Sequence, residues 1–196
     1  MSDSSDFNKK PAGISRREFM GRTTVAAAAA AGFMIVPRHV LGGKGYTPPS
    51  DKLNIGCIGT GGKGTSDIQA VSTENVVALT DVDDTMMLRL LKAEENSPEQ
   101  AAMFAKAAKY RDFRQMLEKE KSLDAVTVST PDHTHAVAAM MAIKMKKHVF
   151  VQKPLTHTVK EARLLTQEAK KMGIVSQMGN QGHSKEGARL VCEWIW

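Results

Sequence analysis

A short apolar run that leads directly into a glycine pattern is the strongest constraint on what this chain can fold into. Residues Leu53 to Ile58 precede the hexapeptide Gly59-Thr60-Gly61-Gly62-Lys63-Gly64. The run predicts a buried strand, and the glycines predict a tight turn that opens a helix. Gly59 would form the turn, Gly61 would let the backbone approach a pyrophosphate, and Gly64 would let the helix pack against the strand. The helix N-terminus would add free N–H groups and positive dipole for that anion.

An acidic residue follows at the distance that a dinucleotide site requires. The apolar run Val76 to Thr80 ends at Asp81, and a ribose-binding acid is expected about 20 residues after such glycines. A carboxylate there accepts hydrogen bonds from a free 2′-hydroxyl and repels a 2′-phosphate, so NAD is favoured over NADP. Asp83 and Asp84 add negative charge, which Lys63 could offset. The alternative is that the glycines shape only a surface turn and that Asp81 merely ends a strand.

Composition narrows the possible partners. The 196 residues carry a formal net charge of +6, but the basic residues are scattered and only 5% of the chain is aromatic. Nucleic acid binding needs a basic face with aromatic or groove-entering elements, so we expect no nucleic acid partner. Cys57 and Cys192 are both expected to be small buried hydrophobes without a disulfide framework. His133 and His135 lack ligands at convincing spacing, so no metal site is expected.

The first 37 residues have the pattern of a targeting segment. The pair Arg16-Arg17 precedes Thr23 to Val36, an uncharged run with six consecutive alanines. This order of a basic region and a short apolar region indicates a signal peptide, and the paired arginines resemble a twin-arginine export signal. Recognition by the twin-arginine translocation machinery would place the protein in the periplasm or otherwise outside the cytoplasm. An uncleaved segment would act as a membrane anchor. The alternative is an alanine-rich helix with a chance arginine pair.

Strands and helices are expected to alternate after a Gly- and Pro-rich linker at residues 38–51. This alternation predicts an α/β fold of the Rossmann type, with a doubly wound parallel sheet and helices on both faces. Beyond the strand before Gly59, the expected strands are 76–80, 124–130, 149–151 and 174–178. The expected helices are 65–72, 84–94, 98–109, 113–117, 136–145, 159–172 and 185–196. Thr158 and Glu161 form a capping box at the start of the sixth helix, and Gly173 ends it.

Three motifs in this order resemble the glucose-fructose oxidoreductase, inositol dehydrogenase and MocA (Gfo/Idh/MocA) family. They are Gly59 to Gly64, Ser129-Thr130-Pro131-Asp132-His133-Thr134-His135, and Gln152-Lys153-Pro154. The resemblance covers residues 52–196. It implies a NAD-dependent oxidoreductase that transfers hydride between nicotinamide and a hydroxyl of a sugar, cyclitol or sugar derivative.

The resemblance also implies roles for particular residues. Lys153 would lie beside the nicotinamide and contact the substrate as the catalytic residue, next to Gln152 at the cofactor. Gln152 replaces the usual Glu of the family, which removes a charge that could tune the lysine. Thr130, Pro131 and His135 would face the nicotinamide half. The alternatives are a surface lysine before a turn proline, a helix cap at Asp132 and a histidine in a first helical turn.

A polar segment follows the last expected strand. Asn180, Gln181 and His183 could line the substrate side, or they could form a loop that caps the next helix. The last helix ends amid Val191, Trp194, Ile195 and Trp196, which indicates an incomplete terminus. We therefore expect residues 52–182 to form the dinucleotide-binding domain and residues 183–196 to begin the connection to a missing C-terminal α/β domain. In the family that domain often forms the oligomer interface, so a homo-oligomer is expected at full length.

Two other functions remain open at this point. The first is a NAD-dependent glycosidase on the same scaffold, which would oxidise a sugar carbon transiently, permit elimination and then reduce the carbon again. The second is a non-catalytic nucleotide-binding protein, which is consistent with Gln152 and with the absence of a second domain. In either case the fragment alone should hold NAD more convincingly than it could turn over a substrate.

Overall fold

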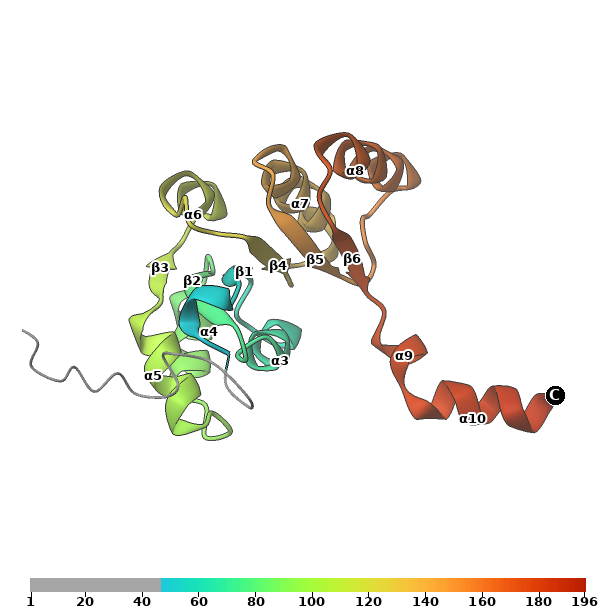
Figure 1. The fold of residues 1–196 in the computed structure, drawn as a ribbon, viewed down its shortest axis with the longest axis horizontal. Helices are drawn as coiled ribbons and strands as arrows, with labels where there is room; N and C mark the ends of the chain where they lie inside the picture. The colour runs from blue at the N-terminus through green and yellow to red at the C-terminus, as the bar shows by residue number, and fades with distance from the viewer. Residues whose placement is uncertain (1–46) are drawn as a thin grey trace, which may run out of the picture. The chain divides into compact units, whose positions relative to one another are not determined.

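Residues 47–196 are described in a computed structural model, and Figure 1 shows their fold. The expected signal segment and residues 38–46 of the expected linker lie outside the described residues. From the rest of the linker, Pro49–Asp51 form a short 3₁₀ turn, η1. Within residues 47–196, no helix has the length and apolar character needed to cross a membrane.

A six-stranded parallel sheet forms the centre of the fold. Its spatial order is β3-β2-β1-β4-β5-β6, and all five neighbouring pairs are parallel. The chain therefore leaves β1 in one direction to β2 and later returns on the other side as β4. This is the expected doubly wound sheet. The strands are β1 (Asn54–Ile58), β2 (Asn75–Thr80), β3 (Ala108–Tyr110), β4 (Ala125–Val128), β5 (His148–Gln152) and β6 (Ser176–Gly179).

Helices cover both faces of the sheet, as the alternating pattern predicts (Figure 1). One face carries α3 (Lys63–Ala70), α4 (Asp84–Leu91) and α5 (Pro98–Lys106). The other carries α6 (Phe113–Lys119), α7 (His135–Lys144) and α8 (Val159–Met172). Two short helices, α9 (Gln181–Ser184) and α10 (Glu186–Ile195), follow β6.

Each face of the sheet has its own apolar core. Ile68 of α3, Leu90 of α4 and Phe104 of α5 are fully buried against one face. Leu117 of α6 and Ile143 of α7 are buried with aliphatic residues of α8 against the other. Burying one such side chain stabilises the fold by about 1.5–3 kcal/mol, so the two cores hold the carboxyl ends of the strands in a fixed arrangement.

Local sequence signals set several helix ends as expected. The Thr158 side chain accepts a hydrogen bond from the Glu161 N–H, and the Glu161 carboxylate accepts one from the Thr158 N–H. This is the predicted capping box. Gly173 then ends α8 with a left-handed backbone conformation, φ 67°, in which glycine avoids the usual Cβ clash.

Three expectations about local structure were wrong. The helix expected over residues 98–109 ends at Lys106, and Ala108–Tyr110 form the edge strand β3 instead. This strand forms because its backbone pairs with β2, a contact that local propensity does not contain. Cys192 is exposed, because α10 buries none of its residues in the described part of the chain. Asp132 caps no helix, since the chain makes a 3₁₀ turn, η2 (Asp132–Thr134), before α7.

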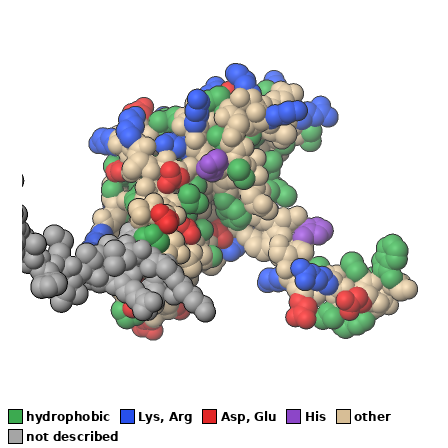
Figure 2. Space-filling view, in the orientation of Figure 1, with side chains coloured by type: hydrophobic (Ala, Val, Ile, Leu, Met, Phe, Trp, Pro, Cys, Tyr) green, Lys and Arg blue, Asp and Glu red, His purple; other side chains and the backbone are tan. Residues whose placement is uncertain are grey.

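Figure 2 shows where the charged and apolar side chains lie on one face of the molecule. Lys and Arg side chains are spread along the edge formed by α6, α7 and α8 and around α9 and α10. Apolar side chains are visible along α10, where Trp194, Ile195 and Trp196 are exposed. The described surface therefore has an apolar helix face at its C-terminal end but no dense cationic groove in this view.

Candidate functional site

A cavity of about 520 Å³ opens at the carboxyl ends of β1, β2 and β4. Ligand pockets commonly measure about 300–1,000 Å³. Doubly wound sheets bind their ligands between two neighbouring strands from which the chain continues in opposite directions, and here those strands are β1 and β4. The lining residues are Ile58, Gly59, Gly61, Gly62, Thr80, Asp81, Val82, Met86, Arg111, Phe113, Ser129, Thr130, Pro131, His133, Thr134 and Ala138.

The glycine turn brings backbone unusually close to backbone. Gly59 has φ 90°, and a Cβ atom there would lie 2.5 Å from the carbonyl oxygen of Ser129. A Cβ on Gly64 would collide with the carbonyl oxygen of Gly59. Glycine is therefore needed at both positions, for the turn and for the close approach of α3 to β1, as the spacing predicts.

The start of α3 offers donors to an anion. The N–H groups of Gly61, Gly62 and Lys63 make no hydrogen bond with any residue from 47 to 196. Such free N–H groups at a helix N-terminus, together with the helix dipole, fit a pyrophosphate. The Lys63 ammonium group points elsewhere, since its Nζ lies 2.7 Å from Asp67 Oδ1 and 2.8 Å from Ser66 Oγ. The backbone N–H groups, and not the lysine ammonium group, are therefore the donors left free at this position.

Asp81 links the end of β2 to the glycine loop. Its Oδ2 accepts hydrogen bonds from the Thr60 N–H at 2.7 Å and from the Thr60 hydroxyl at 3.0 Å. Its Oδ1 accepts one from the Asp83 N–H at 3.0 Å. Because Thr60 is fully buried and Asp81 lines the cavity, the carboxylate is held rigidly at the cavity wall. It is placed to receive ribose hydroxyls.

Several cavity residues were not expected from the sequence. Arg111 donates a hydrogen bond to the Val82 carbonyl at 3.0 Å and pairs with Asp84 at 3.3 Å. Met86 and Phe113 add apolar surface to the same cavity. These residues belong to the segments that follow β2 and β3. The only available signal was their position just after a strand, and the strand before Arg111 was itself missed.

The Ser129 to His135 segment contributes to the cavity in a different way from that expected. Thr130, Pro131 and His133 line it, whereas His135 is buried and does not. The His135 Nδ1 lies 2.7 Å from the Pro154 carbonyl oxygen, and its Nε2 lies 2.8 Å from the Thr130 carbonyl oxygen. The ring thus sits in the first turn of α7 and joins the two loops that carry the second and third motifs.

Gln152 and Lys153 separate at the end of β5. The Gln152 side chain is buried, and its Nε2 donates to Asp67 Oδ2 at 2.8 Å. Lys153 is exposed, and its ammonium group makes no hydrogen bond or ion pair with residues 47–196. Parallel strands share one carboxyl edge, so Lys153 lies on the same edge of the sheet as the glycine loop. It is outside the cavity lining.

The three residues expected on the substrate side lie beyond β6. Asn180 and Gln181 line a separate depression of about 320 Å³ next to this strand. His183 is exposed within α9 and lines neither that depression nor the larger cavity. The described fold does not bring these residues to the glycine loop, so their role in substrate binding stays a prediction.

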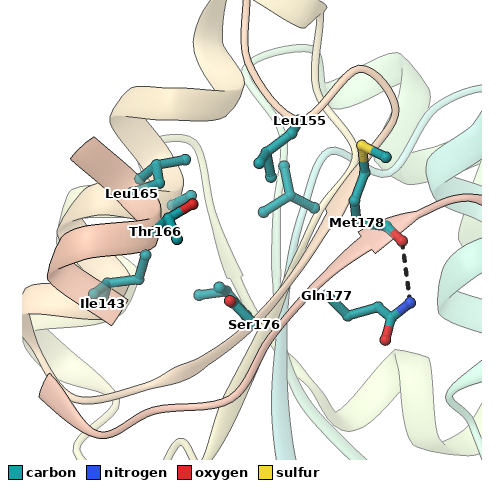
Figure 3. A pocket seen from close by; sticks show the side chains of 10 residues that line it. Ile143, Leu155, Leu165, Thr166, Ser176, Gln177 and Met178 are labelled. Atoms are coloured by element: carbon teal, nitrogen blue, oxygen red, sulfur yellow. Dashed lines mark hydrogen bonds between the residues drawn. The ribbon is translucent and has the colours of Figure 1, made fainter. Parts of the chain in front are cut away.

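A smaller cavity of about 140 Å³ lies between α7, α8 and the strands β5 and β6 (Figure 3). Ile143, Leu155 and Leu165 are among its apolar lining residues, while Thr166 and Ser176 are its hydroxyl groups. Gln177, on the edge strand, donates to the neighbouring Met178 carbonyl at 3.4 Å. This cavity is a gap in the aliphatic core and lacks the converging polar groups that a ligand site needs.

The described residues also bear on metal binding and thiol chemistry. Residues 47–196 contain no group of three or more His, Cys, Asp or Glu side chains placed to hold a metal ion. Cys57 lies inside β1 and is fully buried. Burial disfavours the charged thiolate and raises the pKa of this thiol to about 12. Cys57 therefore packs as a small apolar residue, as expected.

The topology, the glycine turn, the free N–H groups and Asp81 together define a dinucleotide-binding domain of the Rossmann type. The family model described as "Oxidoreductase family, NAD-binding Rossmann fold" (GFO_IDH_MocA) matches residues 53–180, more than half of the chain. The chain belongs to the Gfo/Idh/MocA family of oxidoreductases. The expected family, fold class and NAD cofactor are thus confirmed.

Individual relatives share only part of their length with this chain. A glycosyl hydrolase family 109 protein from Solibacter usitatus is 35% identical over 123 residues, which cover 58% of this chain and 26% of that protein. A myo-inositol 2-dehydrogenase from Thermotoga maritima is 28% identical over 123 residues, which cover 63% and 34%. The chain therefore spans about a quarter to a third of the length of these relatives.

Among solved structures, scyllo-inositol dehydrogenase from Lactobacillus casei, with bound NAD(H) and scyllo-inositol, has a TM-score of 0.61. The two proteins are 19% identical, and the similarity covers 74% of this chain and 41% of that one. At this identity the likeness supports the fold alone.

Proposed function

We propose that the protein is a NAD-dependent oxidoreductase that transfers hydride between the nicotinamide and a CH–OH group of a sugar, cyclitol or sugar derivative. The observation that carries this proposal is that a nucleotide-sized cavity and an exposed lysine lie on the same edge of the sheet. The cavity formed by the glycine loop and Asp81 lies on the same edge as the exposed Lys153, whose ammonium group has no partner in residues 47–196. A nucleotide and a polar reacting group could therefore meet there.

The roles of the residues follow from their positions. The free N–H groups at the start of α3 would hold the pyrophosphate, and Asp81 would bind the adenosine ribose. NAD, when bound, supplies the hydride acceptor. Lys153 would orient the substrate hydroxyl by donating a hydrogen bond, or would take its proton if it is deprotonated when the substrate arrives. Gln152 cannot take a proton, so Lys153 is the candidate acid or base within the motif Gln152-Lys153-Pro154.

The experiment begins with the full-length protein. Mass spectrometry of the ligand released on denaturation should identify NAD, and added NAD should raise the melting temperature of ligand-free protein. If neither result is obtained, the proposal is abandoned. A panel that includes inositols and UDP-linked sugars should then show accumulation of NADH with an active compound.

Lys153→Ala separates a catalytic from a passive lysine. We expect turnover to fall by about 10²–10⁴-fold, as for loss of a general acid or base, while the affinity for NAD changes by less than about threefold. The matched control is Lys160→Ala, which removes an exposed lysine from the outer surface of α8 and should leave both values unchanged. Unchanged turnover in Lys153→Ala would support the non-catalytic alternative.

A NAD-dependent glycosidase is the second candidate, because the 35% identical relative is a glycosyl hydrolase family 109 protein. Both activities would need the same nucleotide cavity. Cleavage of a glycoside without net change in NADH would favour the glycosidase, and net NADH accumulation with a free sugar would favour the dehydrogenase.

We also propose that the protein is exported by the twin-arginine translocation machinery. The support is Arg16-Arg17 followed by the uncharged run Thr23 to Val36. Replacing both arginines by lysine should retain the protein in the cytoplasm, as measured by cell fractionation. Recovery in the membrane fraction would indicate an uncleaved anchor. Export of the lysine variant would contradict the proposal.

At full length we propose a homo-oligomer, as the resemblance to the family implies. Light scattering of the purified full-length protein measures its mass. A monomer at micromolar concentration would refute this proposal.

A further inference from the structure

The buried carboxylate of Asp67 connects the glycine loop to the end of β5, the strand that precedes Lys153. Asp67 lies on α3, and its Oδ2 accepts hydrogen bonds from Gln152 Nε2 and from Ser129 Oγ, both at 2.8 Å. Its Oδ1 pairs with Lys63 Nζ at 2.7 Å. Donors from the ends of β4 and β5 thus converge on one residue of the pyrophosphate helix. Asp67 and Gln152 are 5% and 4% exposed, so water does not compete strongly for these bonds.

The carboxylate decides which way the Gln152 amide points. A carboxylate only accepts hydrogen bonds, so the amide must present its NH₂ group to Asp67. The amide oxygen then faces the chain and accepts a hydrogen bond from the Lys153 N–H at 3.2 Å. Rotating the amide by half a turn would place its oxygen against the carboxylate and remove the acceptor from Lys153. Asp67 therefore influences the Lys153 backbone indirectly, by orienting the Gln152 amide that accepts the Lys153 N–H.

Packing prevents the Gln152 side chain from moving away. A Cβ atom on Gly179, in the neighbouring strand β6, would lie 2.9 Å from the Cδ, Oε1 and Nε2 atoms of Gln152. The amide is thus held between β6 on one side and α3 on the other. A glutamate at position 152 would place a second carboxylate within hydrogen-bond distance of Asp67 in a buried site, where like charges repel strongly. Glutamine at this position donates to Asp67 without adding a second charge.

We propose that Asp67 is a positioning residue that acts through Gln152 to fix the backbone at Lys153, and thereby the place of the lysine relative to the nucleotide loop. This inference rests on the proposed role of Lys153 for its effect on turnover. The part of the inference that concerns the Lys153 backbone conformation does not depend on that role. Asp67 is not itself among the residues that line the cavity. It contacts one of them, Ser129, and does not contact the ammonium group of Lys153.

The test exchanges the charges of the pair in the full-length protein with NAD bound. Gln152→Glu puts two carboxylates face to face, whereas the double variant Asp67→Asn with Gln152→Glu restores one carboxylate and one amide in exchanged places. Hydrogen exchange of the Lys153 N–H reports the fixed backbone directly. We expect exchange at least tenfold faster in Gln152→Glu at pH 7, and exchange within threefold of the original in the double variant.

Turnover adds a readout that a merely structural role would not move. With the substrate found for the proposed function, kcat should fall at least tenfold in Gln152→Glu and recover in the double variant. The NAD dissociation constant should change less than twofold in Gln152→Glu, which leaves the pair between Asp67 and Lys63 of the glycine loop in place. Asp124→Asn is the matched control, because Asp124 is a partly buried carboxylate that accepts the Asn54 N–H at the opposite end of the sheet. It should lower the melting temperature without changing the Lys153 exchange rate.

Several results would overturn the inference. They are unchanged Lys153 exchange in Gln152→Glu, a double variant as impaired as the single one, or equal acceleration of exchange in the Asp124 control. If Gln152→Glu does not fold, Gln152→Met removes both hydrogen bonds without adding charge and should show the same faster exchange. If no sugar is turned over even by the original protein, the proposed function fails, and the exchange rates still decide this inference.

Discussion

Removing the Asp81 carboxylate should weaken both the fold and NAD binding, by amounts that the structure sets. The carboxylate accepts the N–H of fully buried Thr60, and an unpaired buried donor costs about 1–3 kcal/mol. The bond from exposed Asp83 should add little, because water can replace the acceptor. For Asp81→Ala we therefore expect a loss of about 2 kcal/mol, which lowers the melting temperature of a domain of this size by about 4–8 °C.

Asp81→Asn should cost less, because its side-chain oxygen can still accept the Thr60 N–H. The lost charge is worth about 1 kcal/mol for a hydrogen bond. The amide NH₂ also cannot accept the Asp83 N–H, but water can replace that acceptor at the exposed Asp83. NAD affinity should fall roughly ten- to hundredfold in Asp81→Ala, because hydrogen bonds from ribose hydroxyls to a charged acceptor contribute about 1.5–3 kcal/mol. Discrimination against NADP should also decrease, since the repulsion of a 2′-phosphate is gone.

Urea denaturation gives the stability of each variant, and isothermal titration calorimetry gives the NAD and NADP dissociation constants. Thr158→Ala is the control, because it removes the cap of α8 at a cost of about 1 kcal/mol and lies outside the cavity lining. It should lower stability without changing NAD affinity. The reasoning is refuted if Asp81→Ala has the original urea midpoint, or if the Thr158 variant loses as much affinity as the Asp81 variant.

Two further predictions concern titrating groups. Iodoacetamide should label exposed Cys192 in the native protein and Cys57 only after denaturation, because burial raises the pKa of the Cys57 thiol to about 12. Peptide mass spectrometry measures the labelling of each cysteine. Comparable labelling of both in the native protein would contradict the structure. Hydrogen bonds from Arg114 lower the pKa of the Asp112 carboxyl below its usual value. A lowered folded-state pKa adds stability that is fully present above about pH 5 and lost as the pH falls further. In Asp112→Asn the urea midpoint should therefore decrease less steeply as the pH is lowered below about 5. An identical acid slope in the variant would show that Asp112 contributes nothing to it.

The local parts of this fold were predictable because short spacings carry them. The glycine turn, the strand before it and the Thr158 capping box each depend on residues within about one helical turn or one strand. The order of strands and helices then leaves few topologies for a parallel sheet. The family follows from three such local motifs in order, and the family model that matches residues 53–180 confirms it.

The missed elements depend on residues far apart in the sequence. The strand at Ala108–Tyr110 exists through its pairing with Ala78–Thr80, and its short sequence gave no strand signal of its own. Missing it also hid Arg111, which follows this strand into the cavity. Cys192 was expected inside on composition alone, but α10 has no partner within the described residues that would bury it.

By itself, the sequence determined that this chain forms a doubly wound sheet with a dinucleotide turn before Gly64 and an acid at Asp81. Tertiary structure alone decided how the motifs act on one another. It placed Asp67 against Gln152, 85 residues away, and buried His135 between two carbonyl groups. Side-chain orientation of this kind depends on which strands become neighbours and how closely helices approach them. The spacing of residues within a single motif does not determine either.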